Sequence, residues 1–504
     1  MIARAALASC EEPFVDPNEV LQFHLRLSRE TWDLVRLEKN PGLACDAQYT
    51  YQRASFRCGD TEPWIEIGVR HKRGDQRGID APEKPPLKLD FNRFDDSLRW
   101  PSAMGRLGFR KLTLNNGQSN LSGGVLPNLV AERVAWDLMR EQAPFASRTA
   151  WAQLWVHFTD VQGNESIEYR GVYLVIEDLD RTAMRRRHGT SCGALLKTTV
   201  GRCREELEFD DGAPNDARTA YEAWFHDGAG AATDALQLDD LMRQEALRDV
   251  LGNAFDGPLG QQFNNYYRSE PRLGRSRLYP WDLDWLFAAF PLEIAPDTPL
   301  DRTCSPLGVK TRCLDSLRPT YAALACELTQ STLAPEHVLE VWNARDATIR
   351  PVLRLESDAV WAGEDPLDAA LLGSYEATHQ RMQSWIPQRI ASVREALSCP
   401  SDCQASEQPC GVGGCVGKRT CADGAWSTCQ VSSSVESCNG LDDDCDGVID
   451  DGCSLDKEDC AKGVSTPRQN ISSCGCSSLM GLAWPWIFFF RRCVRGSARR
   501  SAPR

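Results

Sequence analysis

The chain has 504 residues and a formal net charge of −14, and 42% of its residues are hydrophobic. This hydrophobic content, together with 15 tryptophans, excludes an intrinsically disordered protein. The acidic balance disfavours nucleic acid as a partner, because basic side chains supply most of the affinity for a phosphate backbone. The length is sufficient for two or three domains with a sizeable core.

The spacing of apolar residues changes along the first 400 positions. Alternation with a period of two predicts strands early in the chain, and helical spacing is most frequent in the second half. We expect strands at 21–27, 64–70, 111–114, 151–158 and 171–177, and helices at 125–139, 236–253, 334–355 and 367–397. Strands early and helices late indicate the α+β fold class, with a helical second half.

Composition divides the chain into five segments. The expected organisation is a leader at 1–18, a globular body at 19–397, a small Cys-rich acidic module at 399–453, a polar linker at 454–473 and a C-terminal segment at 474–504. Charge is unevenly placed, since the last fifteen residues hold six arginines and no acid. Such asymmetry between segments indicates separate roles along the chain.

Cysteine is concentrated near the C-terminus, where 13 of the 21 cysteines lie between Cys399 and Cys493. A dense cluster in a short segment predicts disulfides formed in an oxidising compartment, and therefore export. Zinc binding is the alternative. We favour disulfides, because no histidine follows Cys399 and zinc sites built from cysteine alone usually contain close Cys-x-x-Cys pairs.

The N-terminus resembles the end of a secretory leader. The sequence Leu-Ala-Ser-Cys10 matches a lipoprotein-type cleavage site, which would place a lipid on Cys10. The apolar stretch before it is short for a signal core. Either the true start codon lies upstream, or the match is a coincidence.

A pair of carboxylates stands in the sequence Leu278-Tyr-Pro-Trp-Asp282-Leu-Asp284-Trp-Leu-Phe287. Two acids two positions apart on an extended segment point to the same side, as a divalent cation bound through oxygen requires. The alternative is a pair of loop acids that cap nearby backbone amides.

An upstream segment adds an Asp and two adjacent Asn residues. Asp256 is followed at short range by Asn264 and Asn265. An aspartate that orients a hydroxyl, followed by an Asn oxygen and further carboxylates that hold magnesium, is typical of phosphoryl transfer. The His-Arg-Asp and Asp-Phe-Gly motifs of ordinary protein kinases are missing, so an ordinary protein kinase is excluded.

An ordered series of short motifs runs through roughly residues 20 to 395. The motifs are 68–74, 84–92, 110–116, 132–138, 171–180 and 195–197, followed by Pro280-Trp-Asp-Leu-Asp284. This series resembles the spore-coat-protein-H (CotH) kinase family, and its last member is similar to the most recognisable motif of that family. The ordered series is more specific than any one of its members. The resemblance implies an atypical protein-kinase-like body that uses ATP and Mg²⁺ or Mn²⁺ to phosphorylate secreted or coat proteins.

The resemblance also implies roles for individual residues. Asp256 would be the catalytic base, and Asp282 the chief metal ligand, assisted by Asp284 and by Asn265 or Asn264. Nucleotide-binding candidates are Lys111, Glu132, Glu177 and Lys197. Lys111 has a plain alternative as a solvent-facing residue, because it lies opposite Leu112 and Leu114 in the alternation. Arg70 and Lys72 share one strand face, which could contact phosphate or simply face solvent.

The acidic repeat in the Cys-rich module carries a separate signal. Asp442, Asp444, Asp446 and Asp450 are spaced like the ligands of a calcium loop, and Gly447 allows a sharp bend. The repeat departs from the EF-hand pattern, because no Glu stands at the twelfth position and Cys445 lies inside it. It is similar to a module of bacterial surface proteins that is regarded as metal-binding. A solvated acidic loop is the alternative to Ca²⁺ binding.

The C-terminal segment combines Cys474-Gly-Cys476, an apolar run at 479–490 and an arginine cluster. The apolar run is short for a bilayer span. The combination resembles the tripartite sorting tails of myxobacterial surface proteins, which implies membrane association and a place at the cell surface or outer membrane. A short buried or interfacial segment is the alternative.

These features together predict an exported atypical kinase that transfers the γ-phosphate of ATP to Ser or Thr hydroxyls of a protein substrate at the cell surface. The alternative from another class is a surface adhesion or structural protein that keeps a kinase-like scaffold without catalysis. Three acids at one site favour the enzyme, because a scaffold has little need of them.

Overall fold

The computed structural model describes part of the chain. The described residues are 10–11, 13–38, 49–72, 84–117, 129–143, 145–160, 162–188, 194–197, 206–209, 238–252, 265–270, 275–284, 286–287, 295–297, 318–360, 367–400, 407–412, 415–422, 425–427 and 430–431. They all belong to one compact unit, Met1–Val464, and the second unit, Ser465–Arg504, contains none of them.

Seven strands form a closed barrel in the N-terminal half. In spatial order they are β1 (Val20–Leu27), β2 (Gln52–Cys58), β3 (Ile65–His71), β4 (Leu87–Asp90), β5 (Lys111–Asn115), β7 (Glu165–Glu177) and β6 (Thr149–Thr159). Neighbouring strands are antiparallel except β1 and β6, whose parallel pairing closes the barrel.

Alternation along the strands fills the barrel with apolar side chains. On β1 the odd-numbered residues Leu21 to Leu27 are buried in the barrel core, which is the arrangement that a period of two predicts. Aromatic rings complete this core, since Phe23, Phe56 and Trp100 pack edge to face with centroids 5.1 to 5.5 Å apart.

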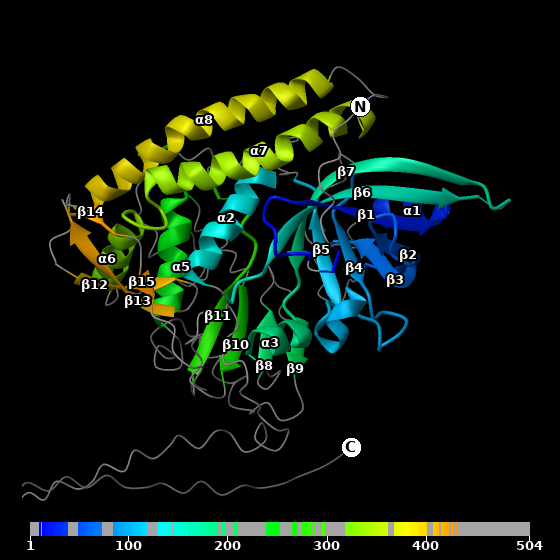
Figure 1. The fold of residues 1–504 in the computed structure, drawn as a ribbon, viewed down its shortest axis with the longest axis horizontal. Helices are drawn as coiled ribbons and strands as arrows, with labels where there is room; N and C mark the ends of the chain where they lie inside the picture. Colours follow the sequence, from blue (N-terminus) through cyan, green and yellow to red (C-terminus); the bar gives the residue numbers. More distant parts are fainter. Residues whose placement is uncertain are drawn as a thin grey trace, which may run out of the picture. The chain divides into compact units, whose positions relative to one another are not determined.

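A second core joins the outer face of the barrel to the helices. Its helices are α2 (Leu129–Gln142), α5 (Leu238–Val250), α6 (Arg318–Leu328), α7 (Pro335–Val360) and α8 (Leu367–Ala396). Trp136 of α2 belongs to this core together with Trp151 of β6 and Leu174 of β7. The long helices α7 and α8 run alongside one another (Figure 1).

Smaller elements complete the described fold. They are α1 (Arg29–Arg36), the 3-10 helix η1 (Ser102–Leu107), α3 (Arg181–His188), a sheet in the order β11 (Arg275–Pro280), β10 (Asn265–Glu270), β8 (Ala194–Lys197), β9 (Glu206–Phe209), and strands β12 (Glu407–Val412), β13 (Cys415–Ala422), β14 (Ala425–Trp426) and β15 (Gln430–Val431). The mixture of early strands and late helices agrees with the α+β expectation. Among the described residues no helix combines the length and apolar character needed to cross a bilayer.

Two disulfides join distant parts of the described chain. Cys10 is bonded to Cys58 at the end of β2, and Cys326 of α6 is bonded to Cys399 just after α8. Phe14 also packs on Phe109, with ring centroids 5.0 Å apart. A leader that ended at residue 18 would remove both Cys10 and Phe14 from the folded unit. The disulfide uses the sulfur to which a lipid would be attached, so a Cys10-lipidated form and this structure exclude one another.

Replacing Cys10 and Cys58 together by serine is expected to lower the free energy of unfolding by about 4 kcal/mol, because the bond closes a loop of 48 residues. Denaturant unfolding measures this change. Peptide mapping without reduction is the companion test and should yield a cross-linked Cys10–Cys58 peptide. A diacylglyceryl mass on Cys10 would contradict the bonded arrangement.

Candidate functional site

The segment after β11 carries the two aspartates predicted to bind metal. β11 ends at Pro280, and Asp282 has a left-handed backbone with φ of 59°. The expectation that Asp282 and Asp284 lie on one extended segment was therefore wrong, and the same-side rule does not apply to them. Asp282 is half-buried, whereas Asp284 is only 5% exposed. A non-glycine residue held in this backbone region is frequently part of a functional site.

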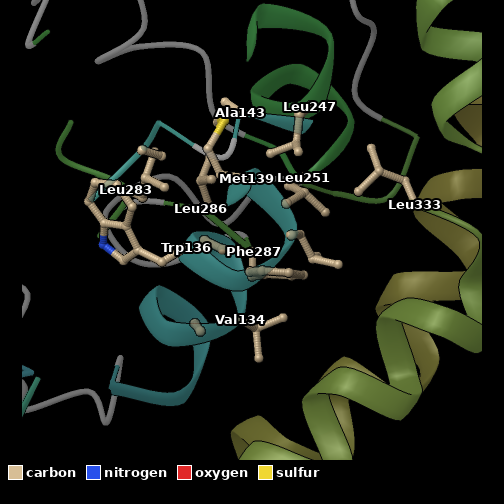
Figure 2. Packing of buried hydrophobic residues seen from close by; sticks show 14 of the residues in the cluster. Val134, Trp136, Met139, Ala143, Leu247, Leu251, Leu283, Leu286, Phe287 and Leu333 are labelled. Carbon is tan, nitrogen blue, oxygen red and sulfur yellow. The ribbon is translucent and has the colours of Figure 1, made fainter. Parts of the chain in front are cut away.

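Apolar side chains fix this loop in the second core. Leu283, Leu286 and Phe287 are each at most 2% exposed and pack near Trp136 of α2 (Figure 2). The backbone N–H of Phe287 also donates to the carbonyl of Leu251 at 2.8 Å. The hydrophobic residues between and after the aspartates therefore anchor the loop.

Helix α5 holds the same loop through two polar side chains one turn apart. Gln244 Nε2 donates to the carbonyl of Leu278 at 2.8 Å, and Arg248 Nη2 donates to the carbonyl of Trp281 at 2.6 Å. Arg248 Nη1 also lies 3.5 Å from the carbonyl of Asp282. Arg248 is 1% exposed, so its guanidinium lies inside the protein. There it holds the carbonyls of Trp281 and Asp282.

Further contacts fix the C-terminal end of α5 in turn. Arg389 of α8 donates to the carbonyls of Asp249 at 2.8 Å and Val250 at 3.1 Å, in the last turn of the helix. The hydroxyl of Tyr321 donates to Asp249. Burial and then the Asp249 charge raise the pKa of Tyr321 well above its ordinary value, so it stays a donor at neutral pH. The helix that holds the aspartate loop is therefore itself held in place by α6 and α8.

A polar network lies on the outer face of β3, β4 and β5. Lys72 Nζ donates to Asn115 Oδ1 at 2.6 Å, and Asn115 Nδ2 donates to Glu132 Oε1 of α2 at 2.7 Å. Lys88 of β4 makes a separate pair, in which its Nζ donates to Asp178 at 2.6 Å. Lys88, Asn115, Glu132 and Asp178 are all at least 90% buried. Sequence reasoning missed Lys88 and Asp178, although Lys88 stands in one of the family-like motifs.

The predicted nucleotide lysine Lys111 is half-buried and lies opposite Asp90 on β4. Burial raises the pKa of Asp90, and the positive charge of Lys111 opposes that rise. Glu132 accepts a hydrogen bond from Asn115, and Asn115 accepts one from Lys72. An asparagine thus links Lys72 to the α2 glutamate.

Glu177 occupies a closed ionic cluster at the end of β7. It has no exposed surface, and Arg148, Arg186 and Arg187 all donate to its two oxygens, with Arg187 at 2.6 Å and Arg148 at 3.1 Å. Burial alone would raise the pKa of Glu177, but the three guanidinium charges outweigh it and hold that pKa well below its usual range. In this position Glu177 joins α3 to the barrel, and both of its oxygens accept from arginines.

The second sheet brings several predicted positions to one end. Asn265 begins β10 and pairs with Pro280, two residues before Asp282. Lys197 ends β8 and pairs with Tyr266, the residue after Asn265. The backbone thus places Asn265, Lys197 and the start of the aspartate loop at the same end of the sheet. Asp256, Asn264, Asp442, Asp444, Asp446 and Asp450 lie outside the described residues, as does the C-terminal segment.

Helix α2 connects the polar network to the aspartate loop. Glu132 and Trp136 are one turn apart on α2, and the Trp136 ring packs edge to face on Trp281 with centroids 6.1 Å apart. Trp281 is the residue before Asp282. A displacement of α2 would therefore act on both groups of residues.

Few oxygen donors lie in the described part of this loop, but their type is suited to a hard cation. Asp282 and Asp284 offer carboxylate oxygens, which Mg²⁺ and Mn²⁺ prefer. Within the described residues no group of three or more His, Cys, Asp or Glu side chains is arranged to hold a metal ion.

In comparisons with known proteins, no family model matches the chain, and no curated protein matches it significantly.

Proposed function

We propose that the chain is an exported atypical protein kinase, which transfers the γ-phosphate of ATP to Ser or Thr hydroxyls of a surface or secreted protein. The observation that carries the proposal is the pairing of Asn265 with Pro280, because it brings an amide-bearing position beside the Asp282–Asp284 loop. In protein kinases, an aspartate and an asparagine from separate segments hold the metal ions.

One group of residues would hold the metal ion, and a second group would bind the nucleotide. Asp282, Asp284 and Asn265 would hold Mg²⁺ or Mn²⁺, which on binding would neutralise phosphate charge. Lys72 and Lys88 would present positive charge toward the nucleotide, with Glu132 and Asp178 orienting them. Asp256 would accept the proton of the attacking hydroxyl. The two disulfides support export, because such bonds persist in oxidising compartments.

Replacing Asp282 by asparagine tests this proposal. The change keeps the size of the side chain and removes its charge, so labelled phosphate transfer from ATP to the secreted protein fraction should fall by about 10²–10³-fold. The control is Asp33→Asn, which removes a partly exposed acid paired with Arg36 and should leave transfer unchanged. Full activity of the Asp282→Asn protein would refute the metal-ligand role.

A second candidate is a non-catalytic adhesion or structural protein. The observation in its favour is Glu177, a residue of a family-like motif whose oxygens are both engaged by arginines of the same protein. Thermal unfolding with and without ATP and Mn²⁺ separates the two candidates. A ligand-dependent rise in midpoint that disappears in Asp282→Asn supports the kinase, and the lack of any rise supports the adhesion protein.

A further inference from the structure

Two buried histidines meet across the parallel seam that closes the barrel. His24 lies on β1 and His157 on β6, and the two residues are 6% and 4% exposed. His24 Nδ1 is 3.0 Å from His157 Nε2, so one ring donates a hydrogen bond to the other. The two strands run parallel through eight paired positions, from Val20 opposite Trp151 to Leu27 opposite Phe158.

Each outer ring nitrogen faces a carboxylate. His24 Nε2 lies 3.8 Å from Asp60, which follows β2, and His157 Nδ1 lies 3.5 Å from Glu165 at the start of β7. Four titratable side chains from four segments therefore form a row in the order carboxylate, imidazole, imidazole, carboxylate. Both carboxylates are well exposed, with side-chain exposures of 64% and 42%.

Positive charges surround the same pair. Arg26 of β1 and Arg57 of β2 lie over the Trp64 ring, with guanidinium carbons 4.5 and 4.7 Å from its centroid. The Trp64 ring in turn packs against His157, with ring centroids 5.2 Å apart. The neighbourhood thus contains two fixed cations and two solvent-screened anions, which disfavours additional positive charge.

We propose that this histidine pair is a proton-binding site that opens the β1–β6 seam in acid. The neutral pair has one proton between the rings and one on an outer nitrogen. A first added proton occupies the other outer nitrogen, where it also faces a carboxylate. A second added proton has only the inner nitrogen left, so two N–H groups then oppose one another across 3.0 Å and the bond between the strands is lost.

The direction of the pH dependence follows from the shifts. Burial, then the charges of Arg57 and His157, lower the pKa of His24 from 6.5 to about 4, with Asp60 opposing the change. Burial also lowers the pKa of His157, against the effect of Glu165. Both folded pKa values lie below the unfolded value. The stabilisation is therefore complete above about pH 6.5 and is lost as the pH falls toward 4.

The Cys10–Cys58 disulfide determines which contact gives way. Cys58 is the last residue of β2 and pairs with Phe23, next to His24. The covalent link ties the segment that leads into β1 to the end of β2, and β1 also pairs with β2 directly. Acid opening should therefore separate β1 from β6 and leave β1 beside β2.

Hydrogen–deuterium exchange of the full chain at pH 7 and pH 4, corrected for intrinsic rates, tests this inference. Peptides covering β1 and β6 should lose protection at pH 4, whereas peptides covering β3 and β4 should keep it. The midpoint of thermal unfolding should fall by about 3 °C over the same range. Uniform loss of protection in every strand would overturn the proposal, because it would indicate general acid unfolding.

The matched variants are His24→Gln with His157→Gln, and His337→Gln as the control. The double change should abolish the β1 and β6 response. His337 is hydrogen-bonded to Glu141, which raises its pKa, so removing it should leave the acid response in place. Should the double variant fold poorly, exchange of the histidine C2 hydrogens in the unchanged protein still decides the matter. Ordinary titration of both His24 and His157 near pH 6.5 would overturn the proposal.

Discussion

Replacing Glu177 by glutamine is expected to lower the free energy of unfolding by about 3–5 kcal/mol, because removing one partner of a buried ionic cluster leaves uncompensated charge. Arg148, Arg186 and Arg187 would then face one another around a neutral amide with no exposed surface. Denaturant unfolding at pH 7 measures the loss.

The control for this prediction is Glu66→Gln on the surface of the barrel. Glu66 pairs with Arg53, and both side chains are more than half exposed, so this change should cost less than about 1 kcal/mol. Similar losses of unfolding free energy in the two variants would show that the buried Glu177 cluster contributes no more stability than an exposed ion pair. Because the pKa of Glu177 is depressed, its contribution should also disappear as the pH falls below the usual carboxylate range.

Replacing Arg248 by methionine is expected to reduce phosphate transfer by about 100-fold, because small displacements of a group that positions the reacting atoms cost that much. Methionine keeps the apolar length of the side chain but removes the donors to the carbonyls of Trp281 and Asp282. Loss of donors to buried carbonyls should also cost about 2 kcal/mol of stability. Phosphate transfer and denaturant unfolding measure the two effects.

Arg243→Met is the matched control, because Arg243 lies on the same helix and pairs with Glu327 and Gln142 at 3.3 Å, away from the loop. It should leave phosphate transfer unchanged. An Arg248→Met protein that keeps its transfer rate while losing stability would assign Arg248 a purely structural role and remove it from the positioning of Asp282.

Elements with clear periodicity could be predicted from the sequence. The alternation at 21–27 and 151–158 corresponds to β1 and β6, and the helical spacing at 334–355 corresponds to most of α7. Strands β10 and β11 have sequences rich in Tyr, Arg and Ser with no apolar alternation, so that signal was missing. The closure of the barrel depends on pairing between distant strands, which local patterns do not encode.

The candidate site was predictable in part. The pair Asp282 and Asp284 was visible as a motif, but the left-handed backbone at Asp282 depends on Arg248, Leu283 and Phe287 meeting in three dimensions. Glu177 was a family-like position, and only the fold shows that it lies among three arginines. Distant partners of this kind leave no trace in the spacing of residues.

The parallel β1–β6 seam has a consequence for the order of folding. His24 and His157 are 133 residues apart, so β1 must wait until β6 has been synthesised before the barrel can close. The meander from β1 to β5 can form earlier, because each of its strands pairs with the next along the chain. Long sequence separation slows the pairing step. We therefore expect barrel closure to be the late, rate-limiting event as the chain emerges, with the β1 edge open until then.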